Sequence, residues 1–180
     1  MAEEQLVDLG LVDSIRAVTI GEPGQRTFNI SARSSRGQAV IWMEKDQLLQ
    51  LSFALQQLSE KQERPDSPSA FAPEYAHTGG PVSVEFKAGD MRVRYDGESD
   101  VFTVEATDPD RRDEEGDAEE ERVAVQFSFG RAAAVGVAEE GQKIVAAGRP
   151  YCPYCHSPID PDGHVCPRSN GHSKSGIPVE

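Results

Sequence analysis

The sequence has few cysteines, few basic residues and no long apolar run. It holds three cysteines in 180 residues, and no segment approaches the ~18 apolar residues that a membrane span needs. The acidic N-terminus lacks the apolar stretch of a secretory signal. These absences point away from a membrane protein and from a disulfide scaffold. We therefore expect a cytoplasmic protein whose thiols stay reduced.

Basic side chains are outnumbered, because 18 Lys and Arg stand against 31 Asp and Glu, which gives a net charge of -13. Binding to a phosphate backbone needs clustered cations, so this balance argues against a non-specific nucleic-acid binder. More than half of the net charge lies in Asp108–Glu121, which has nine acids and two arginines. We expect a solvated, disordered loop there, and the alternative is an acidic docking segment for a basic partner.

Catalytic signatures are also missing. No Walker, dinucleotide-binding or nucleophile-elbow pattern occurs in the sequence. The segment Gly21–Arg26 resembles a phosphate loop only superficially, since it lacks the Gly-Lys-Ser/Thr ending and does not open a helix. Its Pro and Gly residues predict a hairpin turn instead. The sequence therefore indicates no catalytic residue, and it favours a function other than that of an enzyme.

Apolar periodicity predicts an α+β fold. Alternating residues indicate half-buried strands, and the continuously apolar run Ala39–Met43 is typical of an interior strand. A helical period follows in 44–61 and returns in 131–147. The predicted strands are 15–20, 26–32, 39–43, 82–86, 91–95, 102–106 and 123–129.

The two halves show the same order of predicted elements. The apolar helix face made of Leu48, Leu51, Leu55 and Leu58 corresponds to Ala134, Val137, Gly141 and Ile144 at a constant offset of 86. We interpret this as two pseudo-repeated strand–strand–strand–helix units in one antiparallel sheet, with both helices on one face. A chance likeness of two amphipathic segments is the alternative. Gly136 and Gly141 weaken a helix, so they predict a close approach of the second helix to the sheet or to the first helix.

The expected organisation follows from these patterns and from the Pro- and Gly-rich linker at 62–80. It comprises a disordered lead-in (1–12), a body (13–148) with units 13–61 and 81–148 and an acidic loop (108–121), a zinc knuckle (149–174) and a tail (175–180).

All three cysteines and three of the four histidines lie between Cys152 and His172. Cys152-Pro-x-Cys155 is typical of a zinc knuckle, in which a tight turn points two thiolates at one ion. His164 and Cys166 are two residues apart and would project from the same face of a return strand. We expect these four residues to bind one structural Zn²⁺ in a zinc-ribbon-like knuckle, with His172 as the rival fourth ligand. His156 lies in the turn and is expected to be a bystander.

Other uses of the cysteines are less consistent with the sequence. A redox Cys-x-x-Cys normally opens a helix, which Pro158 and Pro161 forbid. A disulfide would leave one cysteine over. A catalytic zinc needs an open coordination position, whereas four good ligands within twenty residues indicate a filled one.

Several stretches resemble an uncharacterised bacterial domain-of-unknown-function family, numbered three-zero-nine-zero. The matching stretches are Gly21–Phe28, Glu44–Gln47, Met91–Ala106 and Ala147–Gly171. The resemblance implies that His164, and not His172, is the fourth ligand, and that a small residue is usual at His156. The family has no established activity. Its members are encoded near predicted phosphatase and lipid-kinase-like genes, which implies a regulatory role.

The function expected from the sequence is a regulatory binding or adaptor module whose partner is another protein, with the zinc tail folded back as a rigid clip or second contact point. One alternative is an enzyme acting on a small molecule, with Arg26 and Glu44 in a cleft between the two units. A weaker alternative is a nucleic-acid binder that uses the knuckle. Residues 149–180 carry three cations and three side-chain anions, so this tail is electrically neutral.

Overall fold

The computed structural model describes residues 6–73, 79–110, 123–157, 159–160 and 162–168. Within them two helices and eight strands confirm the α+β class. Neither helix is long and apolar enough to cross a membrane, among the residues described. The elements are β1 (Val7–Leu11), β2 (Ser14–Ile20), β3 (Thr27–Ser34), β4 (Gly37–Met43), α1 (Lys45–Lys61), β5 (Val82–Lys87), β6 (Met91–Asp96), β7 (Val101–Thr107), β8 (Val123–Gly130) and α2 (Arg131–Ala146).

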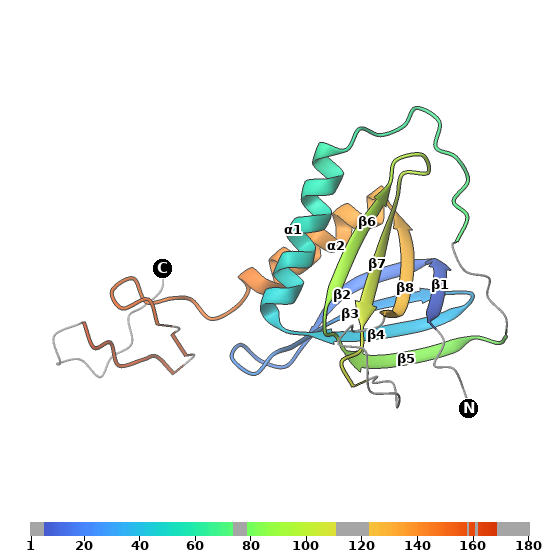
Figure 1. Cartoon of the computed structure of the whole chain (residues 1–180). Coiled ribbons are helices and arrows are strands. Elements are labelled where there is room, and N and C mark those ends of the chain that lie inside the picture. The colour runs from blue at the N-terminus through green and yellow to red at the C-terminus, as the bar shows by residue number, and fades with distance from the viewer. Residues whose placement is uncertain (1–5, 74–78, 111–122, 158, 161, 169–180) are drawn as a thin grey trace, which may run out of the picture.

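The strands form two four-stranded sheets, and the expectation of one antiparallel sheet is wrong. The sheet orders are β2-β3-β4-β5 and β1-β8-β7-β6. Each sheet contains an antiparallel meander, and its third strand takes a parallel partner from the other half of the chain: β5 pairs with β4, and β1 pairs with β8. Both parallel pairs join strands that are distant in the sequence, so local periodicity does not reveal them. Strands β6–β8 run across β2–β5 in Figure 1.

Strand β1 also corrects the expected disordered lead-in. Its residues Val7–Leu11 lie in a sheet, and Leu9 is 1% exposed. The buried Asp8 carboxylate accepts a hydrogen bond from the Gly10 N–H at 2.7 Å and pairs with the Arg36 guanidinium at 3.5 Å. The pattern was missed because the strand is short and irregular, since its register against β8 shifts between Asp8 and Leu11. Residues 1–5 of the lead-in lie outside the described part.

The two helices run antiparallel and side by side (Figure 1). They meet where Gly141 of α2 faces Ser52 of α1, and a Cβ atom added at Gly141 would lie 2.1 Å from the Ser52 Oγ. The expected close approach is therefore confirmed for Gly141, which abuts the first helix. It is wrong for Gly136, where an added Cβ would meet nothing within 4 Å.

Each helix also covers the edge strand of the other half, instead of both lying on one face of a single sheet. Helix α2 packs against β2, and α1 packs against β6. At the first of these contacts the Glu140 carboxylate accepts a hydrogen bond from the Ala17 backbone N–H at 3.0 Å and pairs with Arg16 at 3.0 Å. The helix pair thus ties the two meanders together and shields an otherwise open strand edge.

The two halves place their residues in the same register. Phe28 pairs with Met43 across β3 and β4, and Phe102 pairs with Phe129 across β7 and β8. The buried face of α1 comprises Leu48, Leu51, Ser52 and Leu55, and that of α2 includes Ala134, Val137, Ala138 and Gly141. The internal repeat stays a prediction, which a superposition of the two halves would test.

A buried ion pair closes the corner where α2 begins. Asp100 precedes β7 and is 7% exposed, and the first residue of α2, Arg131, is 16% exposed. Their closest nitrogen–oxygen distance is 2.7 Å. The Tyr95 hydroxyl donates to the Asp100 carboxylate at 2.8 Å, and Arg131 also donates to the Ser59 carbonyl near the end of α1. Hydrogen bonding from Arg131 lowers the pKa of Asp100 despite burial.

Replacing this carboxylate should destabilise the protein in a pH-dependent way. We expect Asp100→Asn to lower the free energy of unfolding at neutral pH by about 3 kcal/mol, because Arg131 keeps its charge and loses its partner. A depressed carboxyl pKa stabilises the fold above the ordinary aspartate pKa of about 3.9, and this contribution is lost as pH falls through the lower folded value. Denaturant unfolding of wild type and variant should therefore converge in acid. The control is Asp66→Asn, at an exposed position. A difference in the free energy of unfolding between wild type and Asp100→Asn that does not change with pH would contradict the account.

Candidate metal centre

The metal centre is built on a tight turn that follows α2. Backbone hydrogen bonds hold this turn: His156 N–H donates to the Cys152 carbonyl at 2.9 Å, and Cys152 N–H donates to the Ser157 carbonyl at 2.8 Å. The turn requires a left-handed residue, and His156 adopts it with φ of 58°. A glycine takes this conformation without strain, which accounts for the small residue that the family resemblance implies at this position.

The structure brings the four predicted ligands together. Ligand atoms of Cys152, Cys155, His164 and Cys166 all lie within 4.8 Å of one another. The Sγ atoms of Cys152 and Cys166 are 3.7 Å apart, and Cys155 Sγ is 3.2 Å from His164 Nε2. A tetrahedral site with metal–sulfur bonds of ~2.3 Å has sulfur–sulfur edges of about 3.8 Å. The spacing therefore fits one tetrahedral ion.

The surroundings of the thiols differ. Hydrogen bonds from the backbone and hydroxyl of Ser157, with a further one from His164, lower the pKa of Cys155 to about 6. Burial instead raises the pKa of Cys152, which is 0% exposed. Burial next to two further sulfurs disfavours the thiolate form of Cys152. A bound cation would stabilise that thiolate.

Three thiolates and one imidazole are the donor set that structural zinc sites use. Cys152, Cys155, His164 and Cys166 would hold the ion through four protein ligands, which leaves no open position for a water or a substrate. What such an ion supplies is folding energy for a segment with almost no core of its own. Of the other two histidines of the sequence analysis, His156 is outside the cluster, and His172 lies outside the described residues.

The metal centre projects from the body instead of folding back on it. In Figure 1 the chain leaves α2 and extends away from both sheets. At its base, Arg149 and Asp160 form an ion pair. The expectation of a tail folded back as a clip is therefore wrong, and a short, polar segment with few apolar side chains explains the outcome.

Comparison with protein families identifies the chain. The family model described as protein of unknown function (DUF3090) matches residues 8–166, and the chain belongs to this family, as the resemblance implied. The match begins within β1 and ends at Cys166, so it includes the body and all four cluster residues. Comparisons with curated proteins and with solved structures give no match.

The expected cleft near Arg26 and Glu44 is only partly present. Arg26 lines a pocket, but Glu44 does not, since it lies at the start of α1 and pairs with Lys87 at 2.6 Å. Lys45 and Arg149 line the pocket instead. Sequence analysis missed these two residues because they belong to segments over one hundred positions apart, and the only signal was that both lie in stretches carrying the family resemblance.

Metal analysis of single variants tests the ligand assignment. Protein prepared without chelator should carry one zinc per chain, and Cys152→Ser or His164→Ala should lose most of it, because three ligands bind far more weakly than four. His172→Ala is the matched control and should keep the full amount. Loss of zinc in His172→Ala with retention in His164→Ala would show that the fourth ligand is misassigned.

Proposed function

We propose that this protein is a zinc-stabilised binding module that acts as an adaptor, with the metal centre as a rigid contact element. The observation that carries the proposal is the closed ligand set of Cys152, Cys155, His164 and Cys166. A filled tetrahedron has no position for chemistry, so the ion serves to hold the chain in shape. The projecting position of this element supports a role in contacting another molecule.

The metal centre presents two exposed side chains with apolar surface, those of Tyr154 and Val165. Tyr154 is 57% exposed and lies between the ligands Cys152 and Cys155. Val165 is 94% exposed and lies between His164 and Cys166. Both residues are thus fixed by ligands on either side once an ion is bound. Aromatic and aliphatic side chains held rigidly in solvent are the kind of group that a protein partner buries.

The alternatives have weaker support. Among the described residues, no carboxylate, imidazole or thiol lines the pocket that holds Arg26, which fits binding better than general acid–base or nucleophilic catalysis. A nucleic-acid binder needs an excess of basic residues, whereas in residues 149–180 three cations stand against three side-chain anions. A protein partner requires neither feature.

A double variant of the metal centre tests the adaptor proposal. Wild type and variants are immobilised and exposed to an extract of the native cell. The double variant Tyr154→Ser with Val165→Ser should keep one zinc per chain and the melting temperature of the body. It should fail to retain the partner that wild type retains. Ile20→Ser is the matched control, since Ile20 is 55% exposed on the body. A partner found by mass spectrometry should bind wild type and Ile20→Ser equally. Equal capture by the double variant would contradict the proposal.

A further inference from the structure

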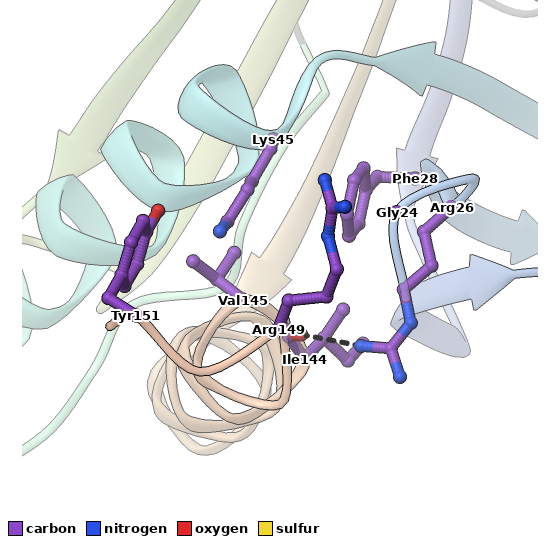
Figure 2. Close-up of a pocket in the computed structure, with 9 residues that line it drawn as sticks. Gly24, Arg26, Phe28, Lys45, Ile144, Val145, Arg149 and Tyr151 are labelled. Carbon is purple, nitrogen blue, oxygen red and sulfur yellow. Dashed lines mark hydrogen bonds between the residues drawn. The ribbon is translucent and has the colours of Figure 1, made fainter. Parts of the chain in front are cut away.

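A small pocket lies where the start of α1 meets the end of α2 and the β2–β3 hairpin (Figure 2). Its volume is about 190 Å³. All three charged residues that line it are cations: Arg26, Lys45 and Arg149. This clustering runs against the composition of a chain whose net charge is -13. The remaining wall is largely apolar and includes Phe28, Val145 and Tyr151.

The backbone is shaped to admit two of these cations. In Figure 2 the Lys45 amino group and the Arg149 guanidinium project into the space between Tyr151 and Phe28. A Cβ atom at Gly24 would lie 3.2 Å from the Arg149 Cζ, and one at Gly148 would lie 3.3 Å from the Lys45 Nζ. Both glycines thus leave room for a charged side chain where a larger residue would crowd it.

The protein only partly neutralises these charges. Arg26 donates to the Ala147 carbonyl at 2.8 Å, while its Nε atom is buried with no hydrogen-bond partner in the described structure. Arg149 pairs with Asp160, an aspartate that is 56% exposed and does not line the pocket. For Lys45 the described residues supply neither an ion pair nor a hydrogen bond. A buried donor without a partner is costly, so the pocket favours an added acceptor.

The corresponding corner of the second half shows what satisfies such a position. Arg26 stands two residues before Phe28, and Asp100 stands two before Phe102. Lys45 stands two residues after Met43, and Arg131 stands two after Phe129. In the second half the chain itself places a carboxylate against the cation that opens the helix. In the first half the same register positions hold two cations, and no carboxylate of the described residues lines the pocket.

We propose that this pocket binds the phosphate group of a small phosphate ester. A phosphate monoester carries about two negative charges at neutral pH and three acceptor oxygens, which suits a pocket lined by three cations better than a carboxylate does. The pocket is smaller than the ~300–1,000 Å³ typical of sites for drug-sized ligands, so the ester group is compact and lies against Phe28 and Tyr151. None of the four zinc ligands and neither of the exposed residues Tyr154 and Val165 lines this pocket.

Titration with phenyl phosphate tests the proposal on the full, zinc-loaded chain. Calorimetry at constant ionic strength should show one site per chain, and the ligand should raise the melting temperature. Inorganic phosphate should bind more weakly, benzoate more weakly still, and phenol not at all. Lys45→Glu and Arg149→Gln should each weaken binding of phenyl phosphate at least about tenfold. Lys61→Gln, an exposed lysine at the other end of α1, is the control and should bind like wild type.

Lys45→Glu gives a second, independent readout. It places a carboxylate between cations, as Asp100 does beside Arg131, so it should raise the melting temperature without ligand while removing the effect of phenyl phosphate. If this variant does not fold, Lys45→Gln replaces it, and weaker binding is then the expected result. The proposal is overturned if wild type binds no phenyl phosphate at millimolar concentration. It is also overturned if the Lys45 and Arg149 variants bind like wild type, or if Lys61→Gln loses binding to the same extent.

Discussion

The close contact between α1 and α2 is the constraint on which the rest of the structure depends. Gly141 lies against Ser52 so tightly that no side chain fits between the two helices. At this distance each helix reaches the edge strand of the other half, and Gln142 donates a hydrogen bond to Gln56 across the pair at 2.7 Å. The proposed phosphate pocket lies at one end of this helix pair, and the segment that carries the metal centre leaves the body from the same end. Both therefore take their position from the helix contact.

The two ends of the helix pair differ in charge, although the strand pairing beside each end has the same register, with Phe28 opposite Met43 and Phe102 opposite Phe129. One end is closed by the Asp100–Arg131 ion pair, which is internal and satisfied. The other end collects Arg26, Lys45 and Arg149 around an open cavity. A structural role accounts for the first arrangement. For the second, cations that the protein neutralises only in part reduce stability, so a ligand that supplies the anion is the physical explanation we favour.

The sequence allowed seven of the eight described strands, both described helices and the clustering of three cysteines with one histidine to be predicted, because each depends on residues close together in the chain. Alternating and continuous apolar runs located β2–β8, and the spacing of Cys152, Cys155, His164 and Cys166 indicated the cluster that the structure brings together. The pairing of β1 with β8 could not be predicted, since it joins the two ends of the body. The pocket was missed for the same reason, as its cations come from the β2–β3 hairpin, the start of α1 and the segment after α2. Residues 111–121 of the expected acidic loop lie outside the described residues, so the disorder of this loop stays a prediction.

The most direct test of this account compares two alanine substitutions in α2. Alanine favours a helix over glycine by about 1 kcal/mol, so Gly136→Ala, at an open and exposed site, should raise the free energy of unfolding by up to that amount. Gly141→Ala should instead lower it by about 1–2 kcal/mol, because the added methyl group collides with Ser52 and overpacks the helix contact. Denaturant unfolding of both variants measures the two changes. Stabilisation by both substitutions would contradict the claim that close helix packing holds the two halves together.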